Sequence, residues 1–237
     1  MCIRDRCLDE CNSLTKLCLT RNDYTEHENS PYDATFFNRF SDDSIEKPVS
    51  WQEGLAYGLA SNSSLKELVI TINHITRRNS DWERILTYGL SVNNSVVSLT
   101  VTVSGYEDFE DSELCVLALK HCIAENKSLT TLTLTLNDYD KGTRCGWLYP
   151  ERLDDFSENS SLTELNLTVN SYGEVSKDWL PRFCDFLMAR CSSLTTVRLQ
   201  VNNRCATSES RIYDLSKLRL KYRSLYTFEL SVTFYGE

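Results

Sequence analysis

The sequence lacks the marks of several large classes of protein. Its 237 residues contain no apolar run of about 18 residues, so we expect no membrane-spanning helix and no membrane partner. Only three histidines are present and no Cys-x-x-Cys pair occurs, so the spacing typical of zinc ligands is missing. We therefore expect no bound metal.

The motifs of common enzyme classes are also missing. The sequence has no Gly-x-Ser-x-Gly, no His-Glu-x-x-His, no Gly-x-Gly-x-x-Gly and no phosphate-binding loop. The histidines are spread along the chain at His27, His74 and His121. Neighbouring carboxylates such as Asp154 and Asp155 point apart rather than across a substrate. We expect a protein that is not an enzyme and that needs no cofactor.

Positive charge is scarce relative to negative charge. The chain has 25 Lys and Arg against 34 Asp and Glu, which gives a formal net charge of −9. Nucleic-acid binding requires clustered Lys and Arg that neutralise phosphates. We therefore expect no nucleic-acid partner, whereas the acidic balance would suit a basic protein partner.

Cysteine is abundant, with ten residues, but its spacing does not suit disulfide bonds. Cys115 and Cys122 are seven residues apart, as are Cys184 and Cys191, and on a helix this separation is about 10 Å. A disulfide needs Cα atoms within about 7 Å of each other. We expect small buried thiols in a reducing compartment, and hence a cytoplasmic protein.

What the sequence does contain is a repeat. The pattern L-x-x-L-x-L-x-x-N, with other apolar residues at some Leu positions, occurs in seven copies. From Leu65 onward the intervals between copies are 31, 33, 33, 32 and 31 residues. Within a copy, as in SLTTLTLTLNDY at 128–139, apolar and polar residues alternate, which predicts a strand with two different faces. The leading residues are Leu14, Leu65, Val96, Leu129, Leu162, Leu194 and Leu225.

A helical pattern precedes the strands. WQEGLAYGLASN at 51–62 and DWERILTYGLSVNN at 81–94 share the pattern W-x-E-x-[LI]-x-Y-G-L-x-x-N. Apolar residues such as Leu55 and Leu59 recur four residues apart, which is the helical period. Each helix is followed by Asn or Ser residues that suit its C-terminal turn. The repeating unit is therefore predicted to be one helix and one strand.

Such units, stacked in register, resemble leucine-rich repeats of the ribonuclease-inhibitor type, as found at the C-terminal end of NOD-like receptors. The resemblance covers residues 7–237 apart from one insertion. It implies an α/β solenoid, or horseshoe, with a parallel concave sheet and outer helices. It also implies a protein-interaction module, namely the ligand-sensing and autoregulatory region of a cytoplasmic innate-immune receptor. Its partner would be a protein ligand or another domain of the full-length protein.

An alternative is a regulatory binding protein that resembles ribonuclease inhibitor or the substrate-reading adaptor of a ubiquitin ligase. The sequence also departs from the repeat family. Its units are a few residues longer, and an extra apolar residue predicts that each strand continues for one more pair of residues. Those apolar residues are Ile72, Val103, Leu136, Val169 and Val201. Two positions after the Asn, where the family has Leu, this sequence has Tyr24, Tyr139 and Tyr172. Tyr106 and Tyr235 stand in the equivalent places of two other copies.

We expect a single repeat domain over 7–237 that is incomplete at both ends. Residues 1–6, MCIRDR, resemble translated adapter sequence and are expected to be a non-native leader. CLDECNSL at 7–14 aligns with CIAENKSL at 122–129, as if the chain began inside a helix of an earlier unit. The acidic segment at about 25–48 is predicted to be a loop inserted between the first two copies.

The outward-facing side of the predicted concave sheet is the first candidate for partner binding. A curved repeat array presents a long face that suits protein partners. Its many threonines also fit a purely structural role, since Thr favours strands and its hydroxyl can pair with neighbouring strands. The candidate contact residues are Glu67, Val69, Thr71, Thr100, Thr102, Thr131, Thr133, Thr135, Glu164, Asn166, Thr168, Arg198, Gln200 and Glu229.

Two further surfaces are weaker candidates. The rim residues Tyr106, Tyr139 and Tyr172 are expected to pack under the loops with their hydroxyls near solvent. In the insertion, 36–40 carries three phenylalanines that would dock back on the repeats or onto a partner.

Five Asn-x-Ser/Thr sequons raise the alternative of an extracellular, glycosylated protein. Four of them fall at the helix-to-strand turn that recurs with the repeat, so we interpret them as a by-product of the repeat. The sequon asparagines are Asn62, Asn93, Asn126, Asn159 and Asn166.

Overall fold

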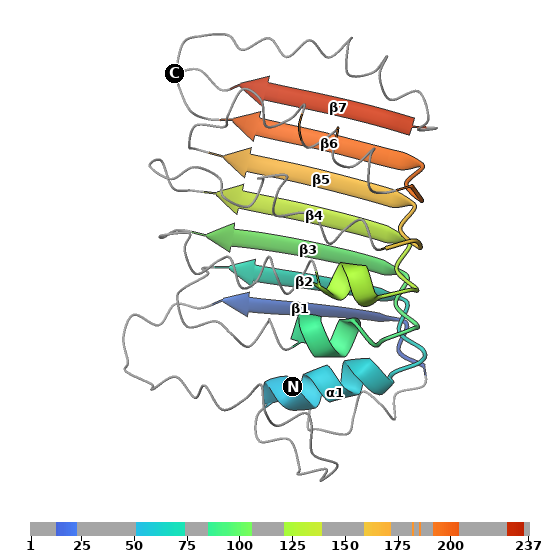
Figure 1. The fold of residues 1–237 in the computed structure, drawn as a ribbon. Helices are drawn as coiled ribbons and strands as arrows, with labels where there is room; N and C mark the ends of the chain where they lie inside the picture. Colours follow the sequence, from blue (N-terminus) through green and yellow to red (C-terminus); the bar gives the residue numbers. More distant parts are fainter. Residues whose placement is uncertain are drawn as a thin grey trace.

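The described part of the chain contains one seven-stranded sheet in which every strand is parallel to its neighbours. The computed structural model describes residues 13–22, 51–73, 85–105, 121–138, 159–171, 182, 185, 192–203 and 227–234. The strands are β1 Lys16–Asn22, β2 Glu67–Asn73, β3 Ser98–Gly105, β4 Thr131–Asp138, β5 Glu164–Ser171, β6 Thr196–Asn203 and β7 Thr227–Phe234. They lie side by side in chain order and point the same way (Figure 1). The predicted parallel sheet is confirmed.

The register of the sheet follows the sequence repeat. Leu68 lies opposite Leu99, which in turn lies opposite Leu132, so equivalent positions of successive copies form rows across the strands. The strands also begin with a shared pattern of backbone hydrogen bonds. The carbonyl of Thr15 accepts hydrogen bonds from the N–H groups of Lys66 and Glu67, at 2.9 and 3.0 Å, and the same pattern recurs at each later strand from β3 to β6. The constant spacing of the sequence therefore becomes a constant register.

One face of the sheet forms the core. On β4, Leu132, Leu134 and Leu136 are buried while Thr131, Thr133 and Thr135 are only partly covered, as a period of two requires. The predicted continuation of each strand by one more buried residue is confirmed. Those residues are between 1% and 7% exposed, and they are Ile72, Val103, Leu136, Val169 and Val201.

The helical segments complete the core on the same side of the sheet. They are α1 Trp51–Ser61, the π-helix η2 Ile85–Leu90, and a short helical turn at 121–125. In Figure 1 these segments rise in steps beside the sheet, and α1 packs directly against η2. Leu59 and Leu86 contribute fully buried side chains to the same core as the strands. The predicted helix at 51–62 is confirmed.

The second predicted helix differs from the expectation in its winding. The sequence pattern predicts an ordinary helix over 81–94, whereas the described part of this segment is a π-helix, η2. A π-helix forms hydrogen bonds five residues apart, so it brings Ile85 and Leu90 to one side of the segment, where both are buried. Gly89, on the same segment, lies against the backbone of α1.

The outer strands β1 and β7 have a described neighbour on one side only. Their apolar residues Leu17, Leu19, Phe228 and Leu230 are partly rather than fully buried, in contrast to the equivalent residues of the inner strands. None of the helices in the described ranges is long and apolar enough to cross a membrane.

Several predictions fall outside the described residues. They concern the leader at 1–6, the insertion at 25–48 with its phenylalanines, the rim residues Tyr106, Tyr139 and Tyr172, the related Tyr24 and Tyr235, and eight of the ten cysteines, including Cys115, Cys184 and Cys191.

Candidate functional site

The fourteen candidate contact residues all lie on the sheet face opposite the core, which we call the Thr face. Along each strand they alternate with the buried apolar residues, and all of them are exposed or half-buried. The register aligns them into rows across the sheet. Thr71, Thr102, Thr135 and Thr168 form one such row, which continues to Gln200. The structure therefore places every predicted residue of this surface where the alternation predicted it.

The centre of the Thr face is uncharged. From 98 to 102 on β3 and from 131 to 135 on β4 its residues are Ser or Thr only, with Thr100 opposite Thr133 and Thr102 opposite Thr135. Each side chain presents a hydroxyl that can donate and accept a hydrogen bond, and the threonines add a methyl group. This zone offers a partner many weak, adaptable polar contacts and no charge to desolvate.

Toward β7, the Thr face carries an ion cluster centred on Arg198, which we call the Arg198 cluster. The Nη1 of Arg198 donates to Glu164 on β5 at 2.5 Å and to Asn166 Oδ1 at 3.3 Å, while its Nε donates to Glu229 on β7 at 3.0 Å. Asn166 Nδ2 in turn donates to Thr133 Oγ1 at 3.3 Å. Five candidate residues from the four adjacent strands β4 to β7 thus form one connected group.

The charges of the Arg198 cluster do not balance. One guanidinium serves two carboxylates, so the cluster carries a net charge of −1. The side chains of Glu164, Arg198 and Glu229 are 33%, 42% and 61% exposed. Because exposed ion pairs add little to stability, typically about 0–1 kcal/mol, the cluster contributes little to holding the sheet together. Its excess negative charge would attract a positively charged group.

Glu67 lies apart from this cluster and has a different partner. It accepts from Lys16 on β1 at 2.8 Å, and both side chains are more than half exposed. The hydrogen bond from Lys16 to Glu67, with their charge attraction, raises the pKa of Lys16 above its ordinary value. The Thr face therefore has a neutral centre between a balanced ion pair on one side and a net negative cluster on the other.

Sequence reasoning missed a buried polar array at the helix-to-strand turns. Asn62, Asn93, Asn126 and Asn159, which we call the turn asparagines, are between 0% and 4% exposed. The Oδ1 of Asn93 accepts hydrogen bonds from the backbone N–H groups two and three residues later, both at 2.8 Å. The same two acceptor contacts recur at the other three turn asparagines. These side chains fix the turn that leads into each of β2 to β5.

The turn asparagines also connect successive units. The Nδ2 of Asn126 donates to the carbonyls of Leu90 and Asn93, both at 2.7 Å, and Asn93 and Asn159 make the equivalent pair of contacts one unit earlier and later. Ser hydroxyls two residues after each Asn reinforce the link, as where Ser128 donates to the carbonyl of Val96 at 2.8 Å. The signal in the sequence is the recurring Asn-x-Ser before four of the leading apolar residues, namely Leu65, Val96, Leu129 and Leu162.

A second ladder of side chains lies at the other end of the strands. It uses the Asn of the repeat pattern itself. Asn137 donates to the hydroxyl of Ser104 at 3.0 Å, Asn170 donates to Asn137 at 2.6 Å, and Asn202 donates to Asn170 at 2.7 Å. The Ser that replaces Asn at 104 keeps the ladder intact because its hydroxyl can act as the acceptor.

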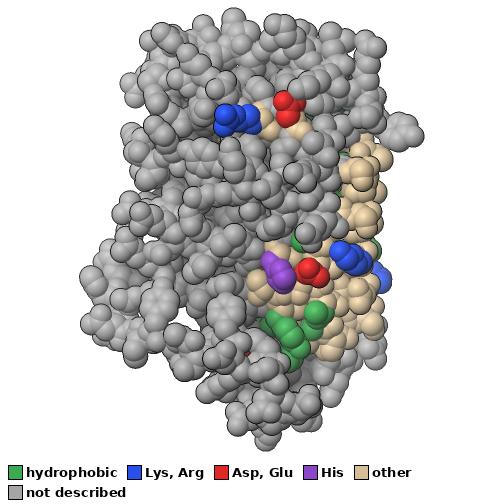
Figure 2. Space-filling model, viewed as in Figure 1, with side chains coloured by type: hydrophobic (Ala, Val, Ile, Leu, Met, Phe, Trp, Pro, Cys, Tyr) green, Lys and Arg blue, Asp and Glu red, His purple; other side chains and the backbone are tan. Residues whose placement is uncertain are grey.

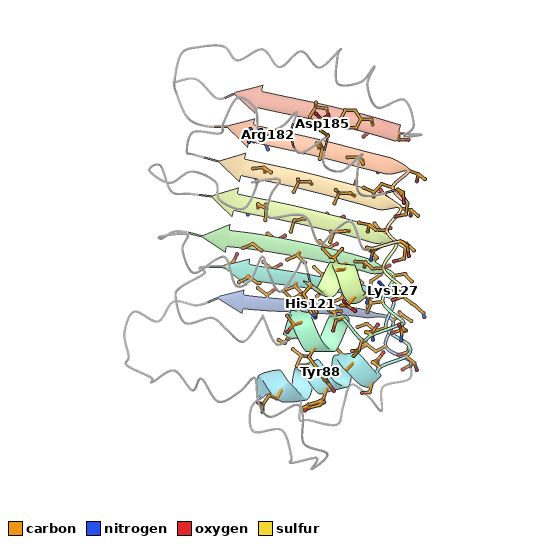
Figure 3. All side chains as sticks on the ribbon, viewed as in Figure 1. Tyr88, His121, Lys127, Arg182 and Asp185 are labelled. Atoms are coloured by element: carbon orange, nitrogen blue, oxygen red, sulfur yellow. The ribbon has the colours of Figure 1, made fainter. Side chains whose placement is uncertain are left out.

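The helical side of the molecule presents a different surface (Figure 2). Tyr57 of α1 and Tyr88 of η2 stand at equivalent positions of adjacent units, with ring centroids 5.0 Å apart in an edge-to-face arrangement. His121 is at the equivalent position of the next unit and is exposed. Partial burial, with the neighbouring ring and Glu53, raises the pKa of Tyr57. Figure 3 labels Tyr88 and His121 on this side, and Lys127 at the edge where the strands begin.

The two cysteines of the described ranges are both free and differ sharply in environment. Cys122 is buried, and burial raises the pKa of its thiol to about 12, whereas Cys18 is exposed on the Thr face. Within the described residues, no group of three or more His, Cys, Asp or Glu is placed to hold a metal ion.

No protein-family model matches the chain, and no curated protein matches it significantly.

Proposed function

We propose that this chain is a protein-interaction module of the leucine-rich repeat type, in which the sheet is the inner, concave wall of a solenoid and the helices lie outside. The observation that carries the proposal is the sheet itself. Seven parallel strands follow one another in chain order and in constant register, with one face buried and the other open. A stack of repeated units suits the recognition of large partners because it offers an extended, continuous surface.

We propose further that the Thr face is the contact surface. The hydroxyl zone on β3 and β4 would provide the area of contact, and the Arg198 cluster would provide orientation. Charged groups at the margin of an interface act mainly on specificity and on the rate of encounter. A basic side chain of the partner would meet Glu229, the most exposed carboxylate of the cluster.

A matched pair of variants tests this surface. Thr133→Arg places a bulky charge in the centre of the Thr face, whereas Thr130→Arg makes the same change at an exposed turn position three residues earlier. Proteins captured by the unaltered chain should be retained by Thr130→Arg and lost with Thr133→Arg. Equal retention by both variants would exclude the Thr face as the contact surface.

The biological setting that we propose is the ligand-sensing and autoregulatory region of a cytoplasmic NOD-like receptor. In that setting, ligand on the Thr face would shift how the repeats pack against a nucleotide-binding domain elsewhere in the full-length protein. The resemblance of the repeat and the spacing of its cysteines support this assignment. Recovery of the full-length reading frame tests it. An upstream nucleotide-binding domain is expected, and a secretion signal in its place would remove the receptor assignment.

The unbalanced charge of the Arg198 cluster favours a second candidate function, a regulatory protein that binds a basic client, resembling ribonuclease inhibitor or a ubiquitin-ligase adaptor. Binding measured at low and high salt separates the two candidates. A charge-driven complex should weaken sharply as salt rises, because exposed charges are screened. Glu229→Gln should reproduce that weakening at low salt, while Glu125→Gln, the same change on the helical side, should not.

A further inference from the structure

Four of the five glycosylation sequons in this chain have their asparagine in the interior. Asn62, Asn93, Asn126 and Asn159 are all buried, with at most 4% of their surface exposed. Asn166, the fifth, is half-buried on the Thr face. A sequon is used only if the amide nitrogen can carry a bulky, hydrated sugar. Whether the four buried asparagines could carry a sugar therefore depends on which groups their amide hydrogens bind.

Each Nδ2 carries two hydrogens, and in three of the turn asparagines both are used. Asn93 donates to Leu59 and Asn62 at 2.6 and 2.9 Å, and Asn126 donates to two backbone carbonyls at 2.7 Å. Asn159 donates to Ile123 and Asn126 at 2.5 and 2.8 Å. All the acceptors are backbone carbonyls of the preceding unit, so no spare hydrogen remains at these nitrogens.

N-glycosylation removes one of those hydrogens. The nitrogen forms a bond to C1 of the first sugar, the lipid diphosphate that carried the oligosaccharide leaves, and one amide proton is lost. One of the two carbonyls of the preceding unit would then lose this donor inside the core, where the loss of a hydrogen bond is costly. The sugar itself would have to occupy space now filled by the neighbouring unit.

We propose that this fold and N-glycosylation of the turn asparagines exclude each other, so that the chain can fold only in a compartment without N-glycosyl transfer. Burial in the folded state gives no protection, because the transfer acts on the chain before it folds. Modification of Asn93, Asn126 and Asn159 would break the links that join the units of β2 to β5. This inference holds whatever the partner of the Thr face is, and it supplies a physical reason for a cytoplasmic setting.

Asn166 provides an internal comparison. Its Nδ2 donates to Thr133 Oγ1 at 3.3 Å and to Glu164 Oε1 at 3.2 Å, both on the Thr face rather than in the core. A glycan on Asn166 would project from the open face and leave the turns intact. The exclusion is therefore a property of the four turn asparagines and not of every sequon in the chain.

The test uses the chain behind a cleavable secretion signal in animal cells, with and without an inhibitor of lipid-linked oligosaccharide synthesis. Both cultures share the same oxidising lumen, so any effect on the cysteines is common to them. Without the inhibitor, we expect glycosylated chain that is retained and loss of secreted, folded protein. With the inhibitor, we expect recovery of secreted chain that melts cooperatively at the temperature of the cytoplasmically expressed protein.

Asn166→Gln is the matched control, and it should not rescue secretion in the culture without inhibitor. Folded chain secreted without inhibitor, whether its turn sequons are modified or skipped, would overturn the proposal. If neither culture secretes the chain, both products are purified in denaturant and refolded in parallel. The proposal then requires that only the unglycosylated chain regain cooperative unfolding, and equal refolding would overturn it.

Discussion

The amide of Asn93 holds two successive units together, since its Nδ2 donates to the carbonyl of Asn62 at 2.9 Å while its Oδ1 accepts from the N–H of Val96 at 2.8 Å. One side chain thus closes the turn of its own unit and fastens it to the unit before. Asn93 is fully buried, so water cannot replace any of these contacts. This double role makes the turn asparagines the most sensitive polar positions of the described chain.

Replacing Asn93 with Ala should be severely destabilising. The change removes the hydrogen bonds from the Asn93 amide to the carbonyls of Leu59 and Asn62, the second of which keeps the hydroxyl of Ser95 as a donor. It also removes the acceptor of the N–H groups of Ser95 and Val96. A buried polar group left unpaired costs about 1–3 kcal/mol, so we expect the free energy of unfolding to fall by about 3 kcal/mol or more. Urea titration followed by circular dichroism measures this fall.

Asn166→Ala is the control for that measurement, because it truncates the same side chain on the Thr face. It should change the free energy of unfolding by less than about 1 kcal/mol, as surface substitutions usually do. Equal losses for the two variants would contradict the bridging role of Asn93.

Truncation of a side chain should cost much more stability on the buried face of β4 than on its open face. Leu132 is fully buried and Thr133, the next residue, is half-buried on the Thr face. Leu132→Ala leaves a cavity and should lower the free energy of unfolding by about 2–5 kcal/mol. Thr133→Ala should have a far smaller effect on stability. A comparable loss in both variants, measured by thermal or urea unfolding, would mean that the Thr face is also core.

Gly89 should not tolerate a methyl group. A Cβ at this position would lie 3.0 Å from the carbonyl oxygen of Ala56 and 3.2 Å from its Cα, so α1 and η2 would have to move apart. Overpacking of this kind costs about 1–3 kcal/mol, more than the roughly 0.5–1 kcal/mol that Ala gains over Gly within a helix. We expect Gly89→Ala to lower the melting temperature, with the exposed Val92→Ala as control. A rise in melting temperature would show that the two segments pack less closely.

Cys122 should resist alkylation while the chain is folded. Its thiol has a pKa of about 12 against an ordinary value of 9.0, so the reactive thiolate is almost absent at pH 8. Iodoacetamide labelling, mapped by mass spectrometry, should modify the exposed Cys18 and spare Cys122 until denaturant is added. Early labelling of Cys122 would contradict its burial.

The same thiol predicts a loss of stability in alkali. Between pH 9 and 12 the folded state keeps the proton of Cys122 while the unfolded state releases it. Because the unfolded state then binds fewer protons, the free energy of unfolding decreases as pH rises through this interval. Cys122→Ala should remove this part of the decrease, which urea titrations at several pH values would reveal.

The sheet could be predicted from the sequence because its determinants are local and periodic. Leu132, Leu134 and Leu136 alternate with threonines, which indicates a two-faced strand, and the nearly constant interval between copies predicts equal register. The Arg198 cluster could not be predicted in the same way. Arg198 meets Glu164 and Glu229 only because residues 34 and 31 positions away become neighbours on the two adjacent strands β5 and β7.

The sequence indicates that the turn asparagines are polar turn formers, but it does not reveal that their side chains are buried. Asn62 and Asn159 occupy a position where Asn favours turns in exposed loops as well. Only the stacking of one unit on the next encloses their amides and supplies the two carbonyl acceptors. The shared Tyr-Gly-Leu pattern likewise does not indicate the π-helical winding of η2.

Because the strands follow one another in chain order and in constant register, this protein can gain or lose whole repeat units. Ser98 lies opposite both Glu67 and Thr131, so deletion of 98–130 would bring β4 beside β2 without shifting any pair of residues. The amide of Asn159 would then meet the carbonyl of Asn93 in place of that of Asn126. Gene duplication and loss can therefore lengthen or shorten the surface offered to partners while every remaining joint is preserved.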